Sequence, residues 1–184
     1  EIFSAQIRAM LKASIGLNNL HILLPMVTSV NEVEEVSYLL ERDWMAVQEE
    51  EQVKITKPKI GIMVEVPSVL LQIDEFAELV DFFSVGSNDL TQYLLAVDRN
   101  NPHVANVYSH FHPSVLRALK RLVQQCHEYN KPISICGEMA GDPLSAVLLM
   151  AMGFNTLSMS SSNILRVRKA ICLVPMTDAI ALLD

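Results

Sequence analysis

Residues 80–92 read Val-Asp-Phe-Phe-Ser-Val-Gly-Ser-Asn-Asp-Leu-Thr-Gln, and this stretch decides the fold. Its apolar run up to Gly86 predicts a short buried strand. Three small polar residues, Ser87, Asn88 and Asp89, follow that strand directly. In α/β proteins, side chains that bind ligands gather at the carboxyl ends of parallel strands. The stretch therefore predicts one strand of a parallel sheet with part of a site at its end.

Two other apolar runs end in polar residues in the same way. Residues 60–64, Ile-Gly-Ile-Met-Val, are followed by Glu65. Residues 132–135, Pro-Ile-Ser-Ile, are followed by Cys136 and, two positions later, by Glu138. Three strands that deliver polar groups at the same relative point indicate one shared site.

Strands and helices alternate along the whole sequence. A helix over residues 1–13 precedes about five strand–helix units. In the third of these units a short helical stretch is expected between Asp89 and Arg99, and a long loop leads to the helix that begins at Pro113. Alternation of this kind predicts a parallel α/β sheet, either doubly wound or a (β/α)8 barrel. The strands are expected at residues 20–26, 60–64, 80–86, 132–135 and 156–160.

The length of the chain favours part of a barrel over a whole one. A complete (β/α)8 barrel takes about 250 residues and eight units, whereas this chain has 184 residues and begins with a helix. We therefore expect the C-terminal part of a (β/α)8, TIM-type barrel, with the first strands missing and residues 1–184 forming a single domain.

Composition excludes several classes of protein. The net charge is -7, which argues against a nucleic-acid binder because such a protein needs a basic face. No apolar run approaches the roughly 20 residues of a membrane span. The three cysteines form no CxxC motif, so neither a zinc site nor a disulfide framework is indicated, and a cytoplasmic location is expected. Cys126 and Cys172 are expected to be small buried hydrophobic residues.

Glu65 and Asp89 are candidates for metal binding. Two carboxylates buried without partners are costly, and a shared Mg²⁺ or Mn²⁺ would relieve that cost. The alternative is that each carboxylate caps a helix or pairs with a Lys or Arg. Asn88 could bind an oxyanion or only shape the turn, and Arg99 could hold a phosphate or carboxylate or lie on the surface.

Cys136 is the candidate acid of the site. It ends an apolar strand, and a thiol with an ordinary pKa near 8.5 starts protonated. The pair His110 and His112 resembles a metal site only superficially, because Pro113 follows directly and favours a junction between a loop and a helix.

Several motifs together resemble a known family. Residues 61–67, residues 81–93 with Asp98-Arg99, and residues 136–142 resemble the C-terminal domain of phosphoenolpyruvate-utilising enzymes, which binds phosphoenolpyruvate (PEP). Within that family the chain is most similar to enzyme I of the phosphotransferase system, and residues 94–101 resemble its nitrogen-related version. Pyruvate phosphate dikinase and PEP synthase are similar but match less well around Arg99 and Cys136.

The resemblance implies a role for each matching residue. Glu65 and Asp89 would bind Mg²⁺, Asn88 and Arg99 would hold the phosphate of PEP, and Cys136 would protonate the enolate carbon as pyruvate forms. The phosphoryl group would pass to a histidine on a separate N-terminal domain and then to a small phosphocarrier protein, and the enzyme is expected to be a homodimer.

The sequence departs from the family pattern in two ways. Ser87 stands where the family often has Thr, and no histidine of this chain matches the family's phosphoryl acceptor. The resemblance also implies that other phosphate-binding arginines lie upstream of Glu1. Two other hypotheses remain: a Mg²⁺-dependent lyase that makes a pyruvate enolate in a similar barrel, and a module that serves only folding or dimerisation.

Overall fold

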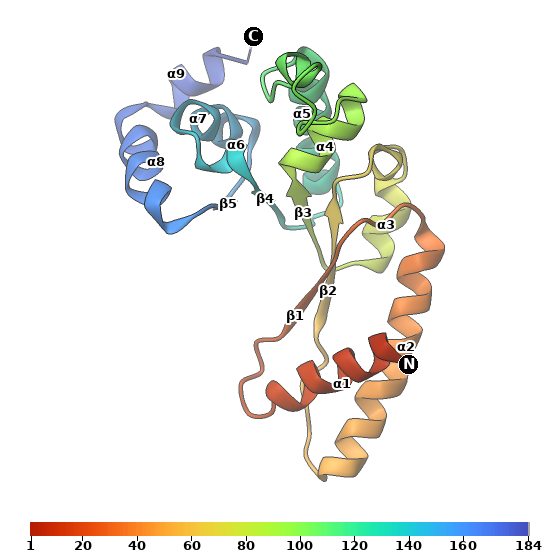
Figure 1. The fold of residues 1–184 in the computed structure, drawn as a ribbon. Helices are drawn as coiled ribbons and strands as arrows, with labels where there is room; N and C mark the ends of the chain where they lie inside the picture. Colours follow the sequence, from red (N-terminus) through yellow and green to blue (C-terminus); the bar gives the residue numbers. More distant parts are fainter. Residues whose placement is uncertain (184) are drawn as a thin grey trace.

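Five parallel strands form one sheet at the centre of the structure (Figure 1). The computed structural model describes residues 1–183, except for the side chain of Ala105. The strand order in the sheet equals the order along the chain, so each strand pairs with the next one. The strands are β1 (His21–Leu24), β2 (Lys59–Val64), β3 (Phe82–Gly86), β4 (Ile133–Cys136) and β5 (Thr156–Ser158).

Helices connect successive strands, as a parallel sheet requires. The expected helix start at Pro113 is confirmed, while a capping box of Ser29 and Glu32 begins α2 and Asp142 is the N-cap of α7. The helices are α1 (Ile2–Ala13), α2 (Val30–Glu51), η1 (Pro67–Leu71), α3 (Ile73–Leu79), α4 (Ser87–Leu95), η2 (Ala105–Val107), α5 (Pro113–Glu128), α6 (Glu138–Gly141), α7 (Pro143–Met152), α8 (Ser161–Leu173) and α9 (Met176–Ala181).

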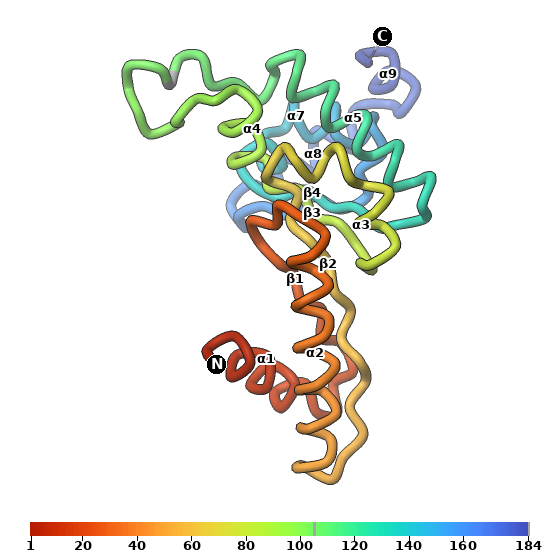
Figure 2. Tube along the Cα trace, turned by 90° about the vertical axis from the view of Figure 1, so that its right-hand side faces the viewer, coloured from red at the N-terminus to blue at the C-terminus, as the bar shows by residue number. Residues whose placement is uncertain are grey.

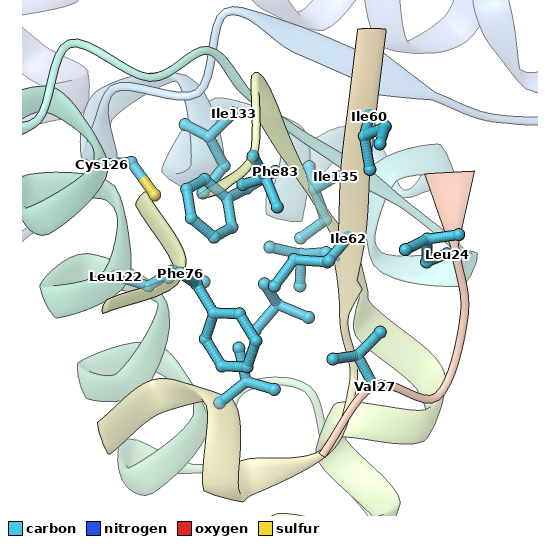
Figure 3. Close-up of a cluster of buried hydrophobic side chains, with 14 of the residues drawn as sticks. Leu24, Val27, Ile60, Ile62, Phe76, Phe83, Leu122, Cys126, Ile133 and Ile135 are labelled. Carbon is cyan, nitrogen blue, oxygen red and sulfur yellow. The ribbon is translucent and has the colours of Figure 1, made fainter. Parts of the chain in front are cut away.

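One face of the sheet carries the hydrophobic core. Alternate residues of each strand point to this face, among them Ile62, Val85 and Ile135, which are completely buried. They form one cluster with apolar side chains of α2, α3, α5 and α7. Figure 3 shows part of this cluster, in which Phe83 lies near Cys126 of α5. This burial fixes the register of the strands and so places their carboxyl ends at one edge.

The opposite face is lined by smaller and more polar residues. Paired strand positions on this face include Met63 beside Ser84 and Gly86 beside Cys136. Within residues 1–183, β1 and β5 each pair with one strand only, so the sheet is open at both edges. The α/β fold with parallel strands is thus confirmed, and the sheet has the form of part of a barrel.

One local prediction about a connection needs correction. The short helical stretch expected between Asp89 and Arg99 is present as α4, but it begins earlier, directly after β3, so Asn88 and Asp89 lie in its first turn. The charged run 49–51 is exposed at the end of α2, where Glu50 and Glu51 pair with Arg8 and Lys12 of α1. Figure 2 shows α1 lying across this end of α2.

We expect Phe83→Ala to lower the free energy of unfolding by about 3–5 kcal/mol, because the removed ring leaves a cavity in a packed core. The side chain of Phe83 is fully buried. The matched control is Phe111→Ala, since Phe111 is 43% exposed, and its effect should stay within about 0.5 kcal/mol. Urea unfolding of the 184-residue chain measures both, and equal effects would contradict the placement of the core.

Candidate active site at the carboxyl ends of the strands

Glu65 is a buried carboxylate that follows β2 directly and is only 4% exposed. Its Oε1 accepts a hydrogen bond of 2.7 Å from the backbone N–H of Met26, just beyond β1. Its Oε2 lies where Gly86 ends β3, because a Cβ added at Gly86 would come within 2.6 Å of that oxygen. The glycine at the end of β3 therefore leaves room for the carboxylate that follows the neighbouring strand, β2.

Burial and a neighbouring charge both act on Glu65. Burial raises the pKa of its carboxyl group, the hydrogen bond from Met26 lowers it, and the negative charge of Asp89 raises it further. Two carboxylates thus repel each other at the strand ends. The two carboxylates therefore lie near each other, and their role as metal ligands stays a prediction.

Asp89 and Arg99 form an ion pair beside Glu65. The Nη2 atom of Arg99 lies 3.6 Å from Oδ1 of Asp89, and both side chains are about one-third exposed (34% and 37%). Asp89 lies in the first turn of α4, where a negative side chain is stabilised by the helix dipole. The alternative that the carboxylate pairs with a Lys or Arg side chain therefore holds for Asp89, which pairs with Arg99. Glu65 has no ion pair among the described residues.

Arg99 also has an unused hydrogen-bond donor. Its Nη1 is buried and has no partner in the described part of the chain. Its backbone N–H donates to Oε1 of Gln92, which ties the loop after α4 back to that helix. A guanidinium with a free donor at a strand end is suited to a phosphate or carboxylate.

Cys136 ends β4, opposite Gly86, and its thiol is half-buried. The thiol donates to the backbone carbonyl of Val85 over 3.3 Å. Burial raises the pKa of the thiol, and the negative charges of Glu65 and Asp89 raise it further. A thiol in these surroundings stays protonated at neutral pH, as a proton donor must.

Asn88 connects the start of α4 to the turn after β4. Its Oδ1 accepts the backbone N–H of Glu138 over 3.2 Å. Because only the amide oxygen can accept this hydrogen bond, the NH₂ group of Asn88 remains free to donate. Asn88 and Cys136 line the same cavity of about 380 Å³, together with Gly137, Glu138, Ser158, Met159, Ser160 and Asn163.

Tyr108 was missed by sequence reasoning, and His110 was considered only in a superficial metal pair with His112. The hydroxyl of Tyr108 donates to the backbone carbonyl of Asn88 over 3.1 Å, and Nδ1 of His110 lies 3.1 Å from the hydroxyl of Thr91. The rings of Tyr108 and His110 meet edge to face. Burial lowers the pKa of His110. No periodic pattern marks this loop, so only its path through space could reveal these contacts.

The pair of carboxylates fits a divalent cation of the magnesium type. Within residues 1–183 no group of three or more His, Cys, Asp and Glu side chains is arranged to hold a metal ion. Mg²⁺, however, is often bound through one or two carboxylates together with substrate phosphates. Such a cation would relieve the repulsion between the buried Glu65 and the partly exposed Asp89, so the donor set and its charge fit the group.

The remaining cysteine and histidine predictions have mixed outcomes. Cys126 is completely buried, and burial raises its pKa to about 12, as expected for a structural thiol. Cys172 is exposed, so the prediction that it is buried is wrong. His112 is the N-cap of α5 and accepts the N–H of Ser114, which confirms the loop-to-helix junction.

No helix among residues 1–183 is both long and apolar enough to span a membrane.

Solved structures with the same fold include two enzymes. A citrate lyase from Burkholderia xenovorans LB400 superimposes with a TM-score of 0.65 and 22% identity, over 91% of this chain and 53% of the other. A pyruvate kinase from Cryptosporidium parvum gives a TM-score of 0.64 and 14% identity, over 90% and 34% of the two chains. At these identities the likeness concerns the fold alone, and it agrees with part of a barrel.

Sequence similarity to curated proteins is much higher. A protein of Salmonella typhimurium named phosphoenolpyruvate-dependent phosphotransferase system is 47% identical over 97% of this chain and 24% of its own length. The phosphoenolpyruvate-protein phosphotransferase of Haemophilus influenzae is 40% identical over the whole of this chain and 32% of its own length. The chain thus spans about a quarter to a third of these relatives.

A family match covers almost the whole chain and agrees with the motifs at the strand ends. The matching family is described as PEP-utilising enzyme, PEP-binding domain, and the match runs over residues 1–175. The chain belongs to the family of PEP-binding domains of PEP-utilising enzymes.

Proposed function

We propose that this chain is the PEP-binding catalytic part of a phosphoenolpyruvate–protein phosphotransferase, enzyme I of the phosphotransferase system. The proposal rests mainly on one observation. A protonated thiol, a pair of carboxylates and an arginine with a free hydrogen-bond donor lie together at one edge of the sheet. The relatives that are 40–47% identical over nearly the whole chain support the same activity.

The reaction assigns a separate task to each side chain. Arg99 and the NH₂ group of Asn88 bind the phosphate of PEP, where their N–H donors face negative oxygens. The P–O bond to the enol oxygen breaks as the phosphoryl group passes to a histidine, which leaves the enolate of pyruvate. Cys136 then gives its S–H proton to the enolate carbon, and the thiolate regains a proton from solvent.

Glu65 and Asp89 would hold Mg²⁺, or alternatively Mn²⁺, at the phosphate. When bound, the cation neutralises charge on the phosphate and carboxylate oxygens of PEP. The carboxylate pair supports this assignment because Glu65 is buried and the charge of the partly exposed Asp89 acts on it.

The acceptor histidine and the partners lie outside this chain in our proposal. The phosphoryl group goes to a histidine on an N-terminal domain and then to a small phosphocarrier protein, in a cytoplasmic homodimer. Residues 1–184 act as one domain, which the single core cluster supports.

The run 94–101 supports the nitrogen-related version of the enzyme. We favour the phosphotransferase over a pyruvate-enolate lyase because the lyase resemblance is one of fold alone.

Replacing Cys136 by Ala in the full-length protein should slow pyruvate formation by roughly 10²–10⁴-fold, the usual cost of a lost general acid. PEP binding should be nearly unchanged, because the thiol does not hold the phosphate. Steady-state kinetics and calorimetry measure the two effects, and Cys172→Ala at the exposed cysteine is the control. A turnover close to wild type in the Cys136 variant would remove the thiol from the reaction.

The rate of pyruvate formation should persist to unusually high pH. The acid works only while protonated. Burial is the largest cause that raises its pKa and would persist with a cation bound at the carboxylates, so activity should fall only as pH rises above the ordinary thiol range of about 8–9. A pH–rate profile of the full-length protein tests this prediction. A decline centred at or below the ordinary range would contradict the surroundings described for Cys136.

Glu65→Gln and Asp89→Asn keep the shape of each side chain and remove its charge. Each should weaken Mn²⁺ binding by more than the roughly 10–100-fold typical of losing a residue that only supports a metal ligand. Electron paramagnetic resonance titration of Mn²⁺ measures the affinity in the full-length protein. Glu75→Gln on the exposed side of α3 is the control, and equal affinity in all three variants would exclude these carboxylates as ligands.

A further inference from the structure

We propose that Ser87 is a positioning residue for the acid of the site: its hydroxyl holds the backbone of Cys136 and so aims the thiol at the enolate carbon. The inference rests on the proposed function, because it concerns the proton transfer assigned there to Cys136. It is carried by three contacts between the first turn of α4 and the turn that follows β4.

The first contact is a buried hydrogen bond. The hydroxyl of Ser87 donates to the backbone carbonyl of Cys136 over 2.7 Å, across 49 positions of sequence. Ser87 is only 2% exposed, so water cannot replace the bond. Loss of the hydroxyl would therefore remove a hydrogen bond that fixes the carbonyl of the acid residue.

The second contact explains why glycine follows the cysteine. Gly137 has a φ of +100°, a region that side chains rarely adopt. A Cβ added there would also collide with the hydroxyl oxygen of Ser87 and would lie 3.0 Å from Oδ1 of Asn88. The turn after β4 is therefore pressed closely against the first turn of α4.

The third contact comes from the residue next to Ser87. Oδ1 of Asn88 accepts the N–H of Glu138 over 3.2 Å, so Ser87 and Asn88 hold the backbone on both sides of Gly137. The same turn of α4 carries Asp89. The position of the thiol is thus fixed relative to the residues proposed to bind the phosphate and the cation.

Ser87 acts through the backbone of Cys136, so its loss should affect proton transfer more than PEP binding. An error of about 1 Å in the position of a reacting group can cost up to roughly 10²-fold in rate. Ser87→Thr would keep the hydroxyl and so separates a requirement for the oxygen from a requirement for serine itself.

The test compares Ser87→Ala, Ser87→Thr and Cys136→Ala, with the double variant of Ser87→Ala and Cys136→Ala, in the full-length protein. Ser87→Ala should lower kcat for pyruvate formation by roughly 10–10²-fold with KM for PEP nearly unchanged. Ser87→Thr should restore the rate. In the Cys136→Ala background, Ser87→Ala should have almost no further effect on kcat, because no thiol remains to be positioned.

A matched control and a second perturbation protect the test against a general loss of stability. Ser145 is equally buried and bonds to Asp142, away from the cysteine, so Ser145→Ala should leave kcat nearly unchanged. Gly137→Ala disturbs the same contact from the other side and should lower kcat as Ser87→Ala does. Should Ser87→Ala fail to fold, Gly137→Ala and Ser87→Thr carry the comparison.

The outcomes separate this inference from the proposed function. If Cys136→Ala itself does not slow pyruvate formation, the proposed acid is wrong, whatever Ser87 does. If Cys136→Ala is slow but Ser87→Ala is not, or the Ser87 effect is the same with and without the thiol, Ser87 is not a positioning residue. A rise in KM without a fall in kcat would also overturn the inference.

Discussion

The site depends on the burial of one carboxylate, Glu65, at the edge of a parallel sheet and near the charge of Asp89. An apolar core fixes the register of the strands and forces their ends together. The absence of a side chain at Gly86 makes room for Glu65, and the N–H of Met26 holds it there. Burying a carboxylate beside a second negative charge is unfavourable by itself. A divalent cation bound at the phosphate-binding site would offset that cost.

Burial and the same charges favour the protonated thiol. Cys136 ends β4, the strand beside β3, and burial raises its pKa more than the negative charges of Glu65 and Asp89 do. A bound cation would offset those charges, whereas the burial of the thiol would remain. The first turn of α4 joins these functions, because its three consecutive residues, 87–89, contact the turn of the acid and carry one of the carboxylates.

Much of this arrangement could be predicted from sequence because parallel strands appear as short apolar runs that end in polar residues. Glu65, Asp89 and Cys136 were found in this way, and their electrostatic coupling confirms that they lie together. The start of α4 was missed because Gly86 provides no side-chain cap, so residues 87–89 have the composition of a loop. The contact of Tyr108 and the exposure of Cys172 could not be predicted for a different reason. Which residues a loop contacts, and which face of a helix other segments bury, depend on the path of the whole chain.

The most direct test of the central claim is a crystal structure of the full-length protein with PEP and Mg²⁺. Our account predicts one Mg²⁺ ion coordinated by Glu65 and Asp89, the phosphate of PEP on Arg99 and Asn88, and the thiol of Cys136 facing the methylene carbon of PEP. A metal ion held by other residues, or a PEP molecule whose methylene carbon faces away from Cys136, would contradict it.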